Sequence, residues 1–176
     1  MRTVFQWADD RWSHHIEHDA VEPCSIIMRS IEGAPVEFWP PSPVIQELQF
    51  QIEPDGTPAA MGVGMSGGSH WSFSCRGCSE LNRPDVRWLL FDVACRTHTE
   101  FERIGSCYRI CPEVTSNDHE TGLLFRSMSG NWRIQASAEY VCVANQTLRM
   151  DIFGRGELML PRTIQWFYVI EPQIAY

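Results

Sequence analysis

The most distinctive reactive side chains in this sequence are two thiols three positions apart. Cys75 and Cys78 have the spacing found in the turn of a zinc knuckle. Cys107 and Cys111 would complete four thiolates around a tetrahedral metal, but about 13 Å of extended strand separates those two residues. Cys75 and Cys78 are therefore candidate metal ligands, with two alternatives, namely a redox pair and ordinary reduced cysteines.

A second candidate is a serine in a glycine-rich stretch. Ser66 is the central residue of Gly64–Gly68, a match to the G-x-S-x-G motif, and Asp92 and His98 follow in the order of a hydrolase triad. That motif needs a strand-to-helix turn, whereas this stretch continues into another strand-like segment. We interpret the overlapping glycine motif at Gly62–Gly67 as a flexible hairpin loop. A serine acyl hydrolase remains an alternative, but the sequence favours a protein that is not an enzyme.

All 14 basic residues are arginine, because the chain contains no lysine. This absence excludes P-loop, protein-kinase, Schiff-base and Ser-x-x-Lys chemistry, each of which requires an amine. The net charge is −8, and the arginines are scattered along the chain. A protein that binds a phosphate backbone needs clustered positive charge, so we expect no nucleic acid partner.

The N-terminal sequence and the number of cysteines indicate the cellular compartment. No run of about 18 apolar residues is present, and the first ten residues lack the apolar core of a secretory signal. The seven cysteines form an odd number, which favours reduced thiols over a disulfide framework. We therefore expect a cytoplasmic protein without a membrane partner.

The elements that must position these residues are strands. Residues 44–52 and Trp132–Cys142 alternate apolar and polar side chains, and we predict that each is one strand with one buried face. Further strands are predicted at 70–76, 86–98, 104–110, 122–128, 148–153 and 163–171. Because no helical pattern separates them, the prediction is an all-β protein of about eight antiparallel strands, arranged as an up-and-down barrel or a two-sheet sandwich.

The first 43 residues differ from the rest of the chain. Asp9–His18 can be written as a short helix, and five prolines break the pattern that follows. We predict a short N-terminal helical and loop-rich arm over residues 1–43. It would pack on an antiparallel β domain at 44–176, so that the chain forms a single domain.

One predicted strand carries a polar set on an otherwise apolar sequence. Asp92, Arg96 and His98 share the even-numbered face with Trp88. The other face is formed by the apolar residues Leu89, Phe91, Val93 and Cys95. A charged pair pointing into a barrel would need a partner or a ligand. The sequence favours the other orientation, in which this face is exposed to solvent.

Seven tryptophans in 176 residues is a high number, and four fall on predicted strands. Large aromatic rings line cavities for small apolar or planar molecules, and they also fill cores. The leading hypothesis is a binding protein for a small apolar or aromatic ligand of unknown identity, and the sequence identifies no cofactor. The candidate ligand-binding residues are Trp71, Trp88, Asp92, Arg96, Trp132, Tyr140 and Trp166. Rival hypotheses are a zinc-stabilised structural or interaction module and a homo-oligomer without a ligand.

Overall fold

The protein is built from two antiparallel β-sheets. A computed structural model describes residues 1–18, 25–80, 83–111, 115–119, 122–127, 130–154 and 159–173. The six-stranded sheet has the order β1 (Arg2–Ala8), β2 (Arg11–His18), β3 (Ser25–Ser30), β8 (Arg103–Ile110), β13 (Thr147–Phe153) and β12 (Tyr140–Ala144). The eight-stranded sheet has the order β4 (Glu47–Ile52), β5 (Pro58–Ser66), β6 (Ser69–Glu80), β7 (Arg83–Thr97), β14 (Arg162–Gln173), β11 (Gly130–Ala136), β10 (Gly122–Ser127) and β9 (Thr115–His119).

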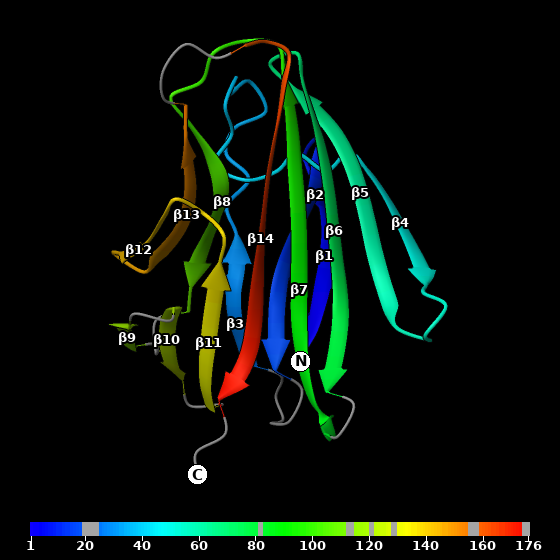
Figure 1. The fold of residues 1–176 in the computed structure, drawn as a ribbon, viewed down its shortest axis with the longest axis vertical. Helices are drawn as coiled ribbons and strands as arrows, with labels where there is room; N and C mark the ends of the chain where they lie inside the picture. Colours follow the sequence, from blue (N-terminus) through cyan, green and yellow to red (C-terminus); the bar gives the residue numbers. More distant parts are fainter. Residues whose placement is uncertain are drawn as a thin grey trace.

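This arrangement confirms the all-β antiparallel prediction, and it fits a sandwich (Figure 1). The barrel alternative is wrong, because the outer strands of both sheets pair on one side only within the described ranges. The estimate of about eight strands is also too low, since several short strands have weak alternation. In the described part of the chain, no helix is long and apolar enough to cross a membrane.

The predicted N-terminal helix is wrong. Residues 11–18 form β2, which pairs with β1 across a tight turn where Asp9 has a positive φ of 56°. His14 and Ile16 are buried on the inward face of the strand. Their spacing of two residues is that of a strand, but the segment also fitted a helical pattern. Residues 1–18 and 25–30 thus belong to the six-stranded sheet, and residues 31–46 form the loop that leads to the other sheet.

The prediction of one long strand over Trp132–Cys142 is also wrong. Its first part is β11 in the eight-stranded sheet, and its last residues begin β12 in the six-stranded sheet. At the crossing, the Ser137 N–H donates to the Phe167 carbonyl at 2.9 Å, and the Phe167 N–H donates to Ser137 Oγ at 2.9 Å. The alternation continues through this crossing, so the sequence pattern alone did not reveal it.

The glycine-rich stretch is mostly strand, with the hairpin turn at its end. Gly67 and Gly68 have positive φ values of 54° and 76° and connect β5 to β6. Gly64 lies within β5, where a Cβ atom would be 2.4 Å from the Val44 carbonyl oxygen. This close approach requires glycine and lets residues 44–46 cross the end of the sandwich.

A chain of buried hydrogen bonds joins the sheets at the centre of the core. His14 Nε2 hydrogen-bonds with Tyr108 Oη at 2.7 Å, and Tyr108 Oη hydrogen-bonds with Tyr168 Oη. Beside them, Trp166 Nε1 donates to Ser106 Oγ at 3.0 Å. Strands β2 and β8 of one sheet are thereby joined to β14 of the other, and both tyrosine hydroxyls and the Trp166 N–H have partners inside the core.

Replacing Tyr108 with Phe tests the contribution of this chain. Tyr108→Phe removes the hydroxyl that His14 and Tyr168 share, so we expect a loss of about 1–3 kcal/mol in the free energy of unfolding. Urea denaturation measures it. The control Tyr140→Phe alters a ring that is 49% exposed and should cost less than about 0.5 kcal/mol. Equal effects of the two substitutions would contradict a special role for Tyr108.

Two titratable side chains, His14 and Glu32, predict that the free energy of unfolding depends on pH. Burial lowers the pKa of His14 to about 3, so the folded protein loses stability as pH falls below the ordinary histidine value of 6.5. Burial raises the pKa of Glu32 to about 7, so the folded form holds a proton between 4.5 and 7 and gains stability as pH falls through that window. The two contributions oppose each other.

The variant Glu32→Gln removes one of these contributions and leaves the other. Its free energy of unfolding should therefore fall by about 1–2 kcal/mol between pH 6.5 and pH 5, more steeply than that of the wild type. Urea denaturation at several pH values provides the measurement. Parallel pH profiles for the two proteins would show that Glu32 does not hold a proton in the folded state.

Candidate functional site

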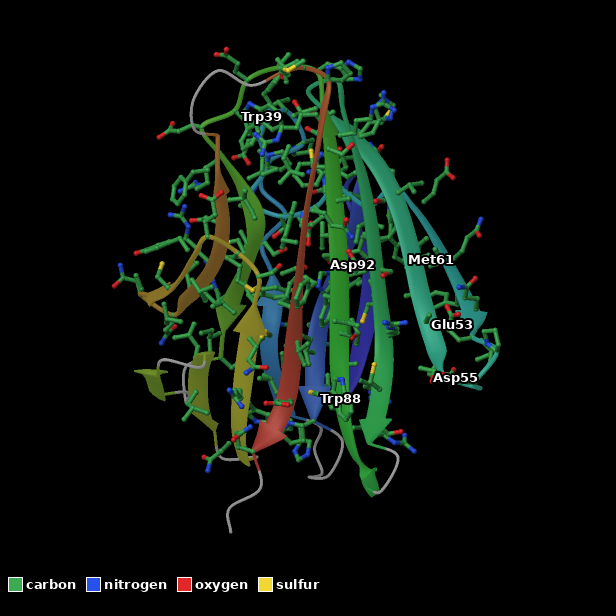
Figure 2. The ribbon with its side chains drawn as sticks, in the orientation of Figure 1. Trp39, Glu53, Asp55, Met61, Trp88 and Asp92 are labelled. Atoms are coloured by element: carbon green, nitrogen blue, oxygen red, sulfur yellow. The ribbon has the colours of Figure 1, made fainter. Side chains whose placement is uncertain are left out.

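The polar set on β7 lies on the outer face of the eight-stranded sheet. Asp92, Arg96 and His98 are exposed, whereas Phe91 and Val93 are completely buried between the sheets. This alternation confirms the predicted solvent-exposed orientation. The Asp92 carboxylate accepts a hydrogen bond from Gln165 Nε2 at 2.9 Å, midway along β7 (Figure 2).

Three of the predicted ligand-binding tryptophans belong to the core. Trp71, Trp132 and Trp166 are at most 2% exposed, and Trp71 packs edge-on against Trp166. Tyr140 lies on β12 and is half exposed. The structure therefore does not bring the seven predicted residues together, because the buried rings point between the sheets while Asp92 and Arg96 point away from them.

Cys75 and Cys78 point to opposite faces of β6. Cys75 is 5% exposed, and its Sγ lies 3.3 Å from Thr3 Oγ1 of the opposite sheet. Burial raises the pKa of the Cys75 thiol to about 12 and also raises that of Cys78, although nearby Arg76 opposes the second shift. Within the described ranges, no three His, Cys, Asp or Glu side chains are grouped to hold a metal ion. The zinc site stays a prediction.

The serine of the hydrolase motif has a structural contact. Ser66 Oγ donates a hydrogen bond to the Glu37 carbonyl at 2.9 Å. Asp92 is bonded to Gln165, and the His98 ring contacts that of His70. The structure therefore does not bring Ser66, Asp92 and His98 together as a hydrogen-bonded triad.

A cleft opens where the two sheets differ in width. Strand β1 is the outer strand of the six-stranded sheet, and it faces β6 through the contacts Thr3–Cys75 and Phe5–Phe73. Strands β4 and β5, which we call the wing (residues 47–66), continue the eight-stranded sheet beyond this point and lean outward (Figure 1). The space between β1 and the wing is a cleft of about 830 Å³.

The walls of the cleft combine apolar and polar groups in similar proportions. Phe50 of the wing contacts the Phe5 ring of β1 at a centroid distance of 5.9 Å, and Ile52 shares its face. Cys75 and Leu89 lie deeper in the cleft and are buried. Further lining residues are Met1, Arg2, Thr3, Gln51, Asp55, Gly56, Thr57, Pro58, Ala59, Ala60, Gly77, Cys78, Ser79, Arg87 and Trp88. The apolar part of this lining can accommodate an apolar ligand.

Two charged groups at the rim of the cleft, Arg2 and Asp55, have partners within the protein. Arg2 Nε forms an ion pair with Glu17 at 2.8 Å. Asp55 lies at the tip of the wing (Figure 2) and accepts a hydrogen bond from the Thr57 N–H at 2.9 Å, which lowers the pKa of its carboxyl group. Arg87 also lines the cleft, and it forms no ion pair with a carboxylate of the described residues.

Sequence reasoning found part of this cleft. Trp88, Cys75 and Cys78 were candidate site residues, and all three line it. Phe5 was missed because its strand was not predicted. Phe50 and Ile52 were assigned to a buried face, yet they are 69% and 70% exposed. Their alternation correctly indicated an inward face, but no local signal showed that the opposite sheet ends before reaching them.

Comparison with known proteins identifies no matching family model, no similar curated protein and no similar solved structure. The geometry of the chain itself therefore has to support any functional proposal.

Differential thiol labelling tests the two faces of β6. With iodoacetamide at pH 8, Cys78 should react well before the buried Cys75, and peptide mass mapping reports both rates. Cys78→Ser is the control that identifies the fast signal. Similar rates at both cysteines would contradict this placement. Protection of Cys78 by added Zn²⁺ would instead favour the predicted metal site.

Proposed function

We propose that this protein binds a small apolar molecule in the cleft between β1 and the wing. The observation that carries the proposal is the exposure of two inward-facing side chains. Phe50 and Ile52 are 69% and 70% exposed although they lie on the face that their sheet turns toward the core. Exposed apolar surface of this kind is typical of a binding site.

The free energy of burying these side chains supports an apolar ligand. Removing a phenylalanine or isoleucine side chain from water yields about 1.5–3 kcal/mol when burial is complete. A ligand placed against Phe50 and Ile52 would recover part of this free energy at both residues. The thiol of Cys75 and the hydroxyl of Thr3 already contact each other, so the floor needs no polar group from the ligand.

The size of the cleft favours a small molecule. Its volume of about 830 Å³ is within the roughly 300–1,000 Å³ of small-molecule sites. Trp88 at its rim supplies an aromatic surface and an intrinsic fluorescent probe. The proposal thus keeps the predicted class of ligand and moves the site from the buried tryptophans to the edge of the sandwich.

A cytoplasmic location is part of the proposal. The six cysteines in the described residues are all free, as expected for a protein kept in a reducing compartment. The thiols of Cys75 and Cys78 point to opposite faces of β6, which disfavours zinc binding as a second function.

The test uses the neutral fluorophore N-phenyl-1-naphthylamine as the probe. We expect the wild type to enhance its fluorescence saturably, and Phe50→Ser to weaken binding about tenfold because an apolar wall is lost. Ile52→Trp should also weaken binding by filling the cleft. Trp88→Phe should keep binding and lose the accompanying change in tryptophan emission.

The matched control is Phe167→Ser. Phe167 is 51% exposed on β14, outside the cleft lining, and its replacement should leave the probe affinity unchanged. Equal losses in Phe50→Ser and Phe167→Ser, or no loss in either cleft variant, would overturn the proposal.

A further inference from the structure

Three nitrogen-bearing side chains meet at one corner of the outer face of the eight-stranded sheet. His70 of β6 lies directly opposite Arg96 of β7, and His98 follows two positions later on the same face. All three side chains are exposed, and the rings of His70 and His98 are 6.4 Å apart between centroids. Directly opposite residues in antiparallel strands have Cβ atoms about 5 Å apart, so their polar ends reach a common ligand.

The corner adjoins a depression with further hydrogen-bond donors. Its volume is about 440 Å³, and His70 and Arg96 form part of its lining. The hydroxyl-bearing residues Ser72 and Thr163 also line it, and Thr163 lies directly opposite Arg96 on the side away from His70. Arg96 is thus flanked by donor groups on both neighbouring strands.

The local charge differs from that of the whole chain. The net charge of the chain is −8, yet Arg96 forms no ion pair with a carboxylate of the described residues. Asp92, the nearest acidic residue on its own face of β7, is hydrogen-bonded to Gln165. Glu47 lines the depression from β4, where it lies opposite Val63. The positive charge of Arg96 therefore remains available to a ligand.

We propose that this corner binds a small oxyanion, with phosphate as the preferred chemistry. The Arg96 guanidinium would donate two parallel hydrogen bonds to phosphate oxygens, the geometry for which arginine is suited. His70 and His98 would donate from the adjacent positions, and the hydroxyls of Ser72 and Thr163 would accommodate either the anion or the group esterified to it. Free phosphate and the phosphate group of a small ester share this chemistry.

The site is independent of the proposed apolar cleft. The two sites share no lining residue, and they lie at opposite ends of the β6–β7 pair, with Cys78 opposite Trp88 at the cleft and His70 opposite Arg96 at the corner. A failure of one proposal therefore leaves the other intact, because each has its own probe and its own variants.

The experiment is a titration of the full chain with inorganic phosphate at pH 6, followed by the NMR resonances of the histidine rings. We expect saturable shifts for His70 and His98, with a dissociation constant in the millimolar range, and smaller shifts for buried His14. Arg96→Gln should weaken phosphate binding at least tenfold. A second titration with glycerol phosphate distinguishes the sources, since tighter binding would indicate a phosphate ester and equal binding the free anion.

The matched control is Arg109→Gln, which removes an exposed arginine from β8 in the other sheet. It should bind phosphate as the wild type does. Chloride at equal ionic strength controls for screening. Shifts of equal size with chloride, or equal affinities for wild type and Arg96→Gln, would overturn the proposal.

Discussion

The unequal width of the two sheets is the constraint on which the proposed binding function depends. A β-sandwich buries the inward face of a strand only where the opposite sheet also has a strand. Here β1 ends the six-stranded sheet opposite β6, while β5 and β4 continue the other sheet beyond it. Phe50 and Ile52 therefore have the alternating sequence pattern of core residues, but they remain exposed because no strand of the other sheet lies opposite them. The cleft is a consequence of topology, and no unusual side chain is needed to create it.

The hydrogen-bonded core explains why the sheets stay together beside this opening. Tyr108 and Tyr168 approach from opposite sheets and meet at their hydroxyl groups, while Phe91 stacks on Tyr168 with the ring centroids 4.6 Å apart. Two tyrosines joined in this way favour one separation between β8 and β14, because a wider spacing would break the hydrogen bond between their buried hydroxyl groups. His14 extends the same chain to β2, next to β1. The tyrosine on β8 thus lies three strands from the open edge at β1, and His14 on β2 lies one strand from it.

Much of the architecture was predictable from local patterns, and most of the errors concern long-range relationships. The alternation in β7 correctly separated Phe91 and Val93 from Asp92 and Arg96, because burial follows the period of two in any strand of a sandwich. The same period continued from Trp132 to Cys142 although the chain changes sheets at Ser137, since alternation does not encode which partner a strand pairs with. Phe5 remained hidden because Asp9–His18 was predicted to be a helix, which left its neighbouring strand β1 without a predicted partner. The site required knowing where a sheet ends, which depends on residues far away in the sequence.

The alternation of side chains also separates the two proposed sites chemically. Along β6 and β7, each step of one residue moves from an apolar interior to a solvated exterior, so one pair of strands presents Cys75 and Leu89 to the cleft and His70 and Arg96 to the outer face. A single small amphipathic ligand cannot reach both, because the sheet itself lies between the two faces. Any coupling between them would have to pass through the backbone of β6 and β7, and the buried rings of Phe73 and Phe91 hold these strands against the core. The structure therefore favours two sites that bind independently over one composite site.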